Sequence, residues 1–250
     1  MFPVIFQYKA LTITTFGVLL GLAFYLAFLL LEREMKLRGK NHEMASTILI
    51  VAIPSAIIGA KLFHIIDNLE QFFASPKDMI LSGDGLSVYG GIIVAFAACY
   101  FVVKKYKESY LETADMVAPA LALGYAVGRI GCHVSGDGCF GVVTDSIFTT
   151  SYPNGIVPTS IGVFPTPLFE SFFSFLVCAF LLNLRKRDLP KGTMIFTYML
   201  LNAVARFAVE FIRVNPKVAF SLTQAQIIAI VIFVLGIAGI VYNFRKKQTA

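Results

Sequence analysis

The sequence predicts an all-α polytopic membrane protein with about seven transmembrane helices. Of its 250 residues, 57% are hydrophobic and only 14% are charged, and the mean hydropathy is +0.76, which is too apolar for a water-soluble domain. Apolar runs of about 20 residues, the length that a helix needs to cross the hydrocarbon core, recur along the whole chain. We therefore expect a single integral-membrane domain over residues 1–250.

The candidate spans differ in how purely apolar they are. The first is longer than the apolar core of a signal peptide and has no cleavage-like end, so we expect it to be retained. The first, third and seventh contain no charged residue, whereas the other four reach full length only by including ionisable side chains. The seven spans lie near residues 11–31, 44–66, 86–103, 114–134, 167–184, 193–213 and 222–243.

One further uncharged stretch, residues 146–169, is not expected to span the membrane. It contains Pro153, Gly155, Pro158 and Pro165, and proline inside a helix removes a backbone hydrogen bond and clashes with the preceding turn. We therefore expect residues 135–166 to form a loop region outside the membrane, a candidate cap over a site on that face.

Lysine and arginine predict the orientation, because short cytoplasmic loops of membrane proteins contain an excess of them. One set of alternate loops contains Arg33, Lys36, Arg38, Lys40, Lys104, Lys105, Lys107, Arg185, Lys186, Arg187, Lys191, Arg245, Lys246 and Lys247. The other set contains only Lys9, Lys77 and Lys217. We expect the N-terminus outside and the C-terminus in the cytoplasm. The net charge of +6 is thus loop charge, and we expect no nucleic-acid partner.

The remaining basic residues lie within or at the end of the proposed spans, and their depth is informative. Lys61, Arg129, Arg206 and Arg213 all fall in the outer third of their spans, and so does Glu170. Ionisable side chains in a bilayer are costly and usually face the bundle interior, where they mark a functional site. Their convergence on the outer leaflet predicts a site for a phospholipid headgroup.

The sixth span carries three of these charges on one face. Arg206, Glu210 and Arg213 are spaced i, i+4, i+7, which aligns them along a helix. The alternative is that Glu210 only neutralises the arginines and that Arg213 extends to the interface.

A glycine-rich segment follows the fourth span. Gly128, Gly131, Gly136, Gly138 and Gly141 surround Arg129 and Asp137. Glycine permits positive φ and close backbone approach, so this segment can bend over a headgroup and offer amide groups to it; a tight exit turn is the alternative. Two shorter segments of the same character, Gly83-Asp84-Gly85 and Tyr89-Gly90-Gly91, precede the third span. For Gly90 and Gly91 the alternative is close helix packing.

Cysteines and histidine in the glycine-rich segment raise the question of a metal. Cys132, His133, Asp137 and Cys139 are all residue types that bind zinc, but their spacing matches no familiar ligand pattern. We therefore expect no metal and no other cofactor. The four cysteines of the chain are too few and too scattered for a disulfide framework.

Taken together, these motifs resemble those of the phosphatidylglycerol–prolipoprotein diacylglyceryl transferases. The resemblance covers most of the chain, and its specific part is the Gly-Arg-Ile-Gly block combined with the Arg-Phe-x-x-Glu-Phe-x-Arg block. The matching segments, in chain order, are Gly59-Ala60-Lys61, Gly85-Leu86-Ser87, Tyr89-Gly90-Gly91, Gly128-Arg129-Ile130-Gly131 with Gly136 and Gly141, Pro165-Thr166-Pro167-Leu168-Phe169-Glu170, Arg206-Phe207, Glu210-Phe211, Arg213 and Gln224.

The resemblance implies transfer of the diacylglyceryl group from phosphatidylglycerol to the lipobox cysteine of a prolipoprotein, with release of glycerol phosphate, at the outer face of the bacterial inner membrane. Arg129 and Arg206 would hold the phosphate, since a guanidinium stays charged and binds two phosphate oxygens. Glu170 and Glu210 would orient the arginines or contact glycerol hydroxyls. Further lipid contacts would come from Arg213, Lys61, Gly90, Gly91, Gly131 and Gly136, and the partners would be the signal peptide and membrane lipids.

Four residues depart from the family's pattern. Tyr89 replaces a histidine that is a candidate base, Cys132 replaces an asparagine, Lys61 an arginine and Asp137 a glutamate. A thiol with a pKa of about 8.5 needs a base near neutral pH, and a phenol with a pKa of about 10 is a poor one. His133, Asp137 and Tyr89 are therefore the candidate bases.

Two other functions compete with the transferase. A catalytically altered family member would bind phospholipid or lipoprotein without transfer, as Tyr89 suggests. A transporter of anions or protons would need polar groups through the full depth of the membrane, and the inner halves of most spans are almost wholly apolar.

Overall fold

The computed structural model describes residues 1–9, 11–81 and 87–248. It is mostly helical, and among the described residues six helices are long and apolar enough to cross a membrane. These are α1 (Thr15–Leu37), α2 (Glu43–Asp67), α6 (Tyr110–Ser135), α7 (Thr166–Leu184), α8 (Thr193–Val209) with the 3₁₀ turn η1 (Glu210–Ile212), and α9 (Gln224–Gln248). The predicted class, an all-α polytopic membrane protein, is confirmed. The third expected span corresponds to the apolar helix α5 (Val88–Lys105), and a total of seven spans stays a prediction.

The first helix begins later than the first expected span. Residues Leu11–Thr14 form strand β2, which pairs with β1 (Val4–Tyr8) in an antiparallel hairpin. Thr12, Ile13 and Thr14 are β-branched, and such residues favour strands because their χ1 rotamers are restricted in a helix. Helix α1 instead continues to Leu37, beyond the expected end at residue 31.

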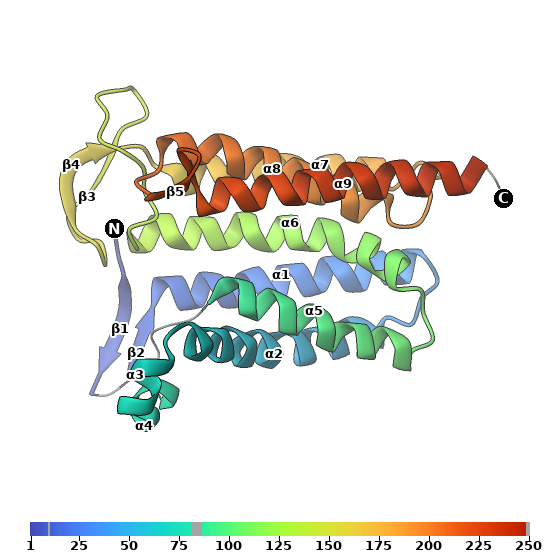
Figure 1. Ribbon diagram of the computed structural model, residues 1–250, viewed down its shortest axis with the longest axis horizontal. Coiled ribbons are helices and arrows are strands. Elements are labelled where there is room, and N and C mark those ends of the chain that lie inside the picture. The colour runs from blue at the N-terminus through green and yellow to red at the C-terminus, as the bar shows by residue number, and fades with distance from the viewer. Residues whose placement is uncertain (10, 82–86, 249–250) are drawn as a thin grey trace. The chain divides into compact units, whose positions relative to one another are not determined.

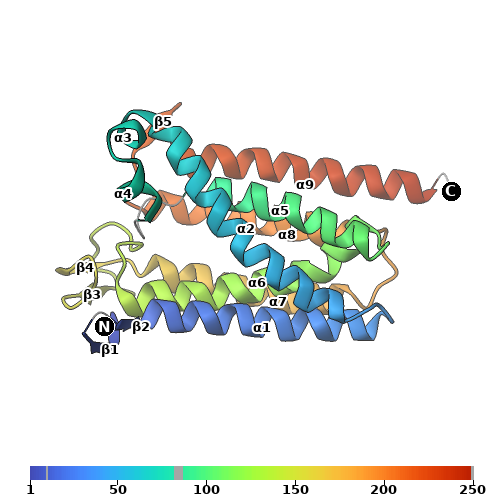
Figure 2. The same ribbon diagram turned by 90° about the horizontal axis from the view of Figure 1, so that it is seen from below.

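The chain divides into two compact units, and the first contains Met1–Leu31 and Ala114–Ala250. In this unit α6 and α7 pack closely, since Ser171 Oγ donates to the carbonyl of Ala126 (2.8 Å) and Ser174 Oγ to that of Ala122 (2.9 Å). Helix α8 lies beside both α7 and α9 (Figures 1 and 2). The core of the unit consists of Ala118, Ala122, Val177, Cys178, Leu181, Met194 and Ile195.

The second unit is Glu32–Thr113, in which α2 and α5 form an antiparallel pair. Small residues let the two backbones approach: a Cβ on Gly91 would lie 2.9 Å from the carbonyl oxygen of Ala56, a close approach typical of membrane helices. The short helices α3 (Leu69–Ala74) and α4 (Pro76–Leu81) follow α2. Lys40 pairs with Glu108 (2.7 Å) and Glu112 (3.3 Å), which links the two connections at one end of this unit.

The loop region predicted at residues 135–166 contains a hairpin of β3 (Thr150–Tyr152) and β4 (Thr159–Val163). A third hairpin, β5 (Lys217–Ala219) with β6 (Leu222–Thr223), precedes α9. Within the loop region, Gly141 N–H donates to the carbonyl of Phe164 (2.8 Å). The loop region is joined to the end of η1 by the hydrogen bond from Val142 N–H to the carbonyl of Ile212 (2.8 Å) and by an antiparallel bridge between Gly141 and Arg213. The glycine-rich segment is therefore anchored to the end of the α8–η1 region.

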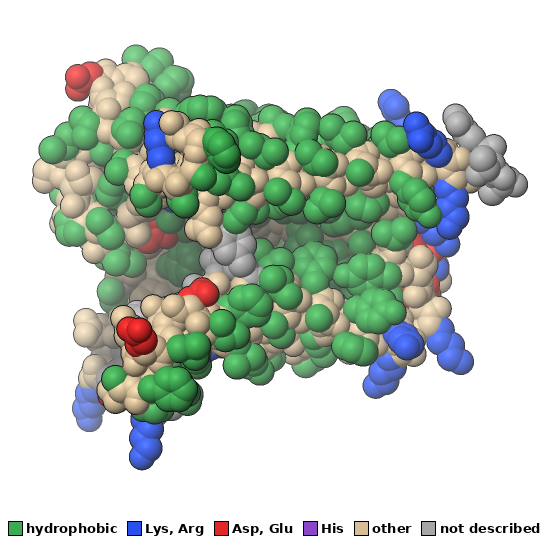
Figure 3. Space-filling model, viewed as in Figure 1, with side chains coloured by type: hydrophobic (Ala, Val, Ile, Leu, Met, Phe, Trp, Pro, Cys, Tyr) green, Lys and Arg blue, Asp and Glu red, His purple; other side chains and the backbone are tan. Residues whose placement is uncertain are grey.

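The surface of α9 has the pattern of a lipid-facing helix. Apolar side chains such as Val231, Val234 and Leu235 are exposed along it, whereas Arg245 and Lys246 are exposed at its C-terminal end. Figure 3 shows the same arrangement, with hydrophobic side chains along the helix and basic ones at the end. Exposed apolar surface of this extent is expected where lipid is the solvent.

Candidate active site

Three helices of the first unit meet at a buried carboxylate, Glu170. Arg129 lies near the C-terminal end of α6, Glu170 in the second turn of α7, and Arg206 in the last turn of α8. Because consecutive helices alternate in direction, these three positions fall at the same end of the unit. Glu170 is only 3% exposed, so its charge requires partners.

Arginines from separate elements supply these partners. Arg206 Nη1 donates to Glu170 Oε1 at 2.8 Å, and Arg129 Nε lies 3.1 Å from Glu170 Oε2. Arg213 Nη1 lies 3.7 Å from the same Oε2 atom. The structure thus brings together Arg129, Glu170, Arg206 and Arg213, which the sequence analysis had placed in three different spans.

Glu210 forms a second, adjoining carboxylate position. Arg206 Nη2 lies 3.1 Å from Glu210 Oε2, so Arg206 bridges Glu170 and Glu210, as the i, i+4 spacing predicted. Asn215 Nδ2 donates to Glu210 Oε1 at 2.5 Å. Asn215 was not predicted, because it follows the end of the helix and no periodicity relates it to Glu210.

The cluster formed by Arg129, Glu170, Arg206, Glu210 and Arg213, named here the arginine cluster, carries three positive and two negative formal charges. Arg213 Nη1 is buried and donates no hydrogen bond to any described residue; its ion pair with Glu170 Oε2, at 3.7 Å, is longer than a hydrogen bond, and a buried donor that makes no hydrogen bond is costly. A net positive charge and an unused guanidinium donor are the properties of a site that binds an anion.

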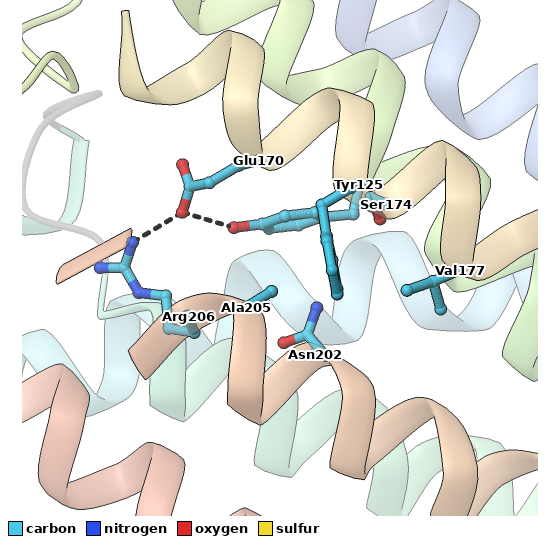
Figure 4. A pocket seen from close by; sticks show the side chains of 8 residues that line it. Tyr125, Glu170, Ser174, Val177, Asn202, Ala205 and Arg206 are labelled. Atoms are coloured by element: carbon cyan, nitrogen blue, oxygen red, sulfur yellow. Dashed lines mark hydrogen bonds and ion pairs between the residues drawn. The ribbon is translucent and has the colours of Figure 1, made fainter. Parts of the chain in front are cut away.

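Tyr125 completes the cluster and was also missed by the sequence analysis. Its hydroxyl donates to Glu170 Oε1 at 3.1 Å, and Arg129 Cζ lies 4.9 Å from its ring centroid, within range of a cation–π interaction. Figure 4 shows Tyr125 and Arg206 converging on the Glu170 carboxylate beside a small cavity that Ser174, Asn202 and Ala205 also line. The available signal was the i, i+4 spacing of Tyr125 and Arg129, which puts both on one face of α6.

The glycine-rich segment reverses the chain at the end of α6. Gly136 and Gly138 have φ of 60° and 84°, the left-handed region that glycine adopts without strain. This turn returns Cys139 to Cys132, and the two sulfurs and an Asp137 carboxylate oxygen lie within 4.8 Å of one another. A hydrogen bond with the Cys132 thiol lowers the pKa of the Cys139 thiol to about 7. Arg129 Nη1 lies 4.0 Å from Cys132 Sγ.

His133 points to the hairpin loop instead. Its Nδ1 and Tyr152 Oη are hydrogen-bonded at 2.9 Å, and the two rings meet edge to face. Burial raises the pKa of Tyr152 to about 12, with a further contribution from the Asp137 charge, so the phenol stays protonated. His133 is thus held by a neutral partner and is not bonded to the arginine cluster by any interaction seen among the described residues.

Two predicted lipid-binding glycines of the first unit have close neighbours in the protein. A Cβ on Gly131 would lie 3.3 Å from Leu19 Cβ on α1, and a Cβ on Gly136 would lie 2.7 Å from Gly155 Cα. Gly131 therefore lets α1 and α6 approach, and Gly136 serves the turn. Their contact with lipid stays a prediction.

The other predicted site residues belong to the second unit. Lys61 lies on α2, and Gly90 and Gly91 on α5, where both glycines pack against α2. Tyr89 is in the first turn of α5, and its backbone alone is described. Gly83, Asp84, Gly85 and Leu86 lie outside the described residues.

The fold and this site define a class: a multi-pass membrane protein with a buried arginine–carboxylate cluster suited to an anionic group. Comparisons with known proteins specify it further. Residues 3–242 match the family model described as prolipoprotein diacylglyceryl transferase, and the chain belongs to this family, which confirms the resemblance.

Curated relatives match over almost the whole chain. Proteins from Clostridium botulinum (strain Langeland) and Clostridium tetani are each 32% identical, over 99% of this chain and 99% and 100% of their own lengths. A protein from Dehalococcoides mccartyi is also 32% identical, over 99% of this chain and 96% of its own. All three are named phosphatidylglycerol–prolipoprotein diacylglyceryl transferase.

Proposed function

We propose that this chain transfers the diacylglyceryl group of phosphatidylglycerol to a cysteine thiol of a prolipoprotein, with release of glycerol phosphate. The observation that carries the proposal is the arginine cluster, in which three arginines surround the buried Glu170 and leave a net positive charge. The anion that we expect to bind at the arginine cluster is the phosphodiester headgroup of phosphatidylglycerol.

The reaction forms a C–S bond and breaks a C–O bond. The cysteine sulfur attacks the glyceryl carbon next to the phosphate, and the electron pair of the broken C–O bond passes to the phosphate oxygen. Negative charge therefore grows on the leaving phosphate. Cations fixed beside that oxygen lower the barrier, since they are already oriented when the charge develops.

Arg129 and Arg206 are the proposed phosphate ligands. Each is held by Glu170, and Arg206 also by Glu210, so the carboxylates fix the guanidinium planes before substrate binds. Arg213 supplies the unused buried donor. Lys61, Gly90, Gly91, Gly131 and Gly136 are proposed to contact the lipid.

The base that takes the thiol proton has three candidates, His133, Asp137 and Tyr89. His133 hydrogen-bonds to Tyr152, which fixes its ring but leaves Nε2 available. Asp137 accepts a hydrogen bond from the backbone N–H of Cys139 (3.0 Å) and lies in the segment that follows Arg129.

The proposed location is the bacterial plasma membrane, with the site at the outer face and the substrate cysteine presented in a lipobox. Glu170 and Arg185 lie near opposite ends of α7, about 22 Å apart at 1.5 Å per residue. The basic segment Arg185–Lys191 is thus opposite the arginine cluster, and the positive-inside rule assigns that basic end to the cytoplasm.

The decisive test is transfer to a lipobox peptide by purified protein in phosphatidylglycerol vesicles. We expect Arg129→Ala and Arg206→Ala each to lower transfer by at least about a hundredfold, the usual effect of removing a group that stabilises transition-state charge. Arg187→Ala is the matched control, because Arg187 is exposed in the basic loop at the other end of α7. Full activity in Arg206→Ala would refute the role in phosphate binding.

A second set of variants separates the candidate bases. If His133 is the base, His133→Ala lowers transfer at neutral pH and the loss shrinks at a pH where the peptide thiol ionises unaided. Tyr152→Phe then acts in the same direction, since it removes the hydrogen bond that orients the ring. Unchanged transfer in His133→Ala would eliminate His133 alone.

A further inference from the structure

The turn after α6 assembles three potential metal ligands that are dispersed in the sequence. Their spacing matches no familiar ligand pattern, and we expected no metal there. The positive φ of Gly136 and Gly138, together with the hydrogen bond from Gly136 N–H to the Cys132 carbonyl (3.0 Å), folds residue 139 back onto residue 132. Cys132, Asp137 and Cys139 consequently present two sulfurs and a carboxylate oxygen within 4.8 Å of one another.

This donor set has the chemistry of a zinc site. Zinc binds thiolate at about 2.3 Å and carboxylate oxygen at about 2.0–2.2 Å, so ligands of a tetrahedral site lie about 3.3–3.8 Å apart. The three atoms need only a small contraction to reach that geometry. Two thiolates also favour a soft or borderline cation over magnesium or calcium, which prefer oxygen ligands.

Neighbouring groups hold the donors in place. The backbone N–H of Cys139 donates to Asp137 Oδ1 (3.0 Å), and Thr166 Oγ1 at the start of α7 donates to the Cys139 carbonyl (2.5 Å). Hydrogen bonds of this kind orient ligands in metal sites. His133 hydrogen-bonds to Tyr152 and is left out of the set.

The position of the set relates it to the proposed chemistry. Arg129 Nη1 lies 4.0 Å from Cys132 Sγ. A divalent cation with two thiolates and one carboxylate carries one net negative charge, which Arg129 offsets. Three protein ligands leave a fourth tetrahedral position open, as in catalytic zinc sites.

We propose that Cys132, Asp137 and Cys139 bind a zinc ion whose open fourth position takes the sulfur of the prolipoprotein cysteine. Binding of zinc by the three residues is argued from their geometry alone, whereas the identity of the fourth ligand rests on the proposed function. On coordination the substrate S–H bond breaks, its electron pair stays on sulfur as the Zn–S bond forms, and the proton passes to water; a coordinated thiol is deprotonated outright. The sulfur then attacks the glyceryl carbon, and the C–O electron pair passes to the phosphate. Such a site supplies the thiolate in a chain that has Tyr89 in place of the family's histidine.

The first experiment measures metal binding without any activity. Purified, reduced, full-length protein is titrated with Co²⁺ as a spectroscopic probe and then with Zn²⁺ in competition. We expect one equivalent of Co²⁺ to produce a thiolate-to-cobalt charge-transfer band that Zn²⁺ abolishes. The Cys132→Ser/Cys139→Ser double variant should lose the band, and Asp137→Asn should bind at least tenfold more weakly. Cys99→Ser is the matched control, because Cys99 lies in α5 of the second unit, and it should bind as the wild type does.

Two results of this experiment would overturn the zinc site. One is a band that is absent, or that persists in the double variant. The other is recovery of a Cys132–Cys139 disulfide as the main form after cells are quenched in acid and alkylated, since a disulfide cannot ligate zinc as two thiolates.

The second experiment tests the fourth ligand. A lipobox peptide added to the Co²⁺ form should intensify the charge-transfer band, whereas the peptide with serine in place of cysteine should not. Equal spectra with both peptides would overturn the assignment of the substrate sulfur to the fourth position.

Transfer that survives complete removal of metal by a chelator would overturn the role of zinc in catalysis while leaving the proposed function intact. Absence of transfer in every metal form would refute the proposed function, while the Co²⁺ titration would still decide the metal site.

Discussion

Glu170 illustrates how single residues set the properties of this site. One carboxylate that is 3% exposed lies within 4 Å of guanidinium nitrogens from Arg129, Arg206 and Arg213. In a medium of low dielectric constant neither the carboxylate nor the arginines are stable alone. The opposite charges of the arginines and the carboxylates therefore stabilise one another, and the one positive charge left over can bind an anion.

Replacing Glu170 by glutamine should destabilise the protein and abolish transfer. The amide keeps the shape of the side chain but leaves three arginines without the central negative charge, and breaking a buried ion pair in this way costs about 3–5 kcal/mol. Thermal unfolding in detergent, with and without phosphatidylglycerol, measures the effect. Because an anionic phosphate can replace part of the missing charge, we expect the lipid to raise the unfolding temperature of Glu170→Gln more than that of the wild type.

Glu32→Gln is the control for this substitution, since Glu32 pairs with the exposed Lys36 at i, i+4 (2.7 Å). An exposed pair of this kind contributes about 0.5 kcal/mol or less. A loss of stability in Glu170→Gln no larger than in Glu32→Gln would contradict the central role of Glu170.

The sequence predicted some residues of the arginine cluster and not others, for a physical reason. The pair Arg206 and Glu210 follows from helix periodicity, which is a local property. The meeting of Arg129 with Glu170, and of Cys132 with Cys139, depends on how helices and turns pack, which periodicity does not contain. Tyr125 was missed because its i, i+4 spacing with Arg129 does not show that its hydroxyl meets a carboxylate on another helix, and Asn215 was missed because it lies beyond the end of the helix, where periodicity no longer applies.

At the scale of elements, the helices followed from the length of apolar runs, and the differences lie at their ends. The first helix starts at Thr15 instead of residue 11 because the preceding β-branched residues pair with Val4–Tyr8. Hairpin formation inside the loop region 135–166 was likewise not predicted, since proline and glycine indicate turns but not which strands pair. The second unit shows that helix pairing follows small residues, which the sequence analysis had considered for Gly90 and Gly91.

Gly90→Ala tests that packing role. A Cβ at position 90 would fall onto Phe63, with the ring carbon Cγ at 2.5 Å, so α2 and α5 must separate. Overpacking of this kind costs about 1–3 kcal/mol, and we expect a lower unfolding temperature in detergent. Gly21→Ala on α1 is the control, because a Cβ there has no neighbour within 4 Å and alanine favours a helix. If Gly90→Ala loses transfer at wild-type stability, its role is lipid contact and not packing.

The ion pairs of Lys40 should make the second unit's stability depend on alkaline pH. The hydrogen bond with Glu108, followed by that with Glu112, raises the pKa of Lys40 above its ordinary value of 10.5. A raised pKa in the folded state means that the stabilisation is fully present below pH 10.5 and is lost as the pH rises through the folded-state pKa.

Lys40→Met should therefore lower the free energy of unfolding by about 1 kcal/mol or less at neutral pH. The difference from the wild type in unfolding temperature should be constant from pH 7 to 9 and shrink above pH 10.5. A difference that persists unchanged at pH 12 would show that the lysine acts through packing of its stem.

At the scale of the whole molecule, charge distribution predicts how the protein sits in the membrane. Within the first unit, the arginine cluster and the hairpins lie at one end of the helices, and the loop Arg185–Lys191 and the C-terminal end of α9 lie at the other (Figure 1). Basic residues that are exposed in short loops face the cytoplasm. The positive-inside rule counts residues in loops, and the arginines of the arginine cluster are buried among helices. Their position at the opposite end therefore does not contradict the prediction that the loop Arg185–Lys191 faces the cytoplasm.

This assignment predicts which positions a membrane-impermeant thiol reagent reaches in intact cells. Ile147 is 92% exposed in the loop before β3, so Ile147→Cys should be labelled before cell lysis. Arg187→Cys, exposed at the opposite end of α7, should be labelled only after lysis. The wild type, with its own four cysteines, gives the background labelling for both variants.

The reverse labelling pattern would invert the predicted topology. It would place the arginine cluster on the side of the membrane where secreted prolipoproteins do not arrive, which would also contradict the proposed function. Equal labelling of both positions before lysis would exclude a transmembrane arrangement of α7 and with it the count of spans.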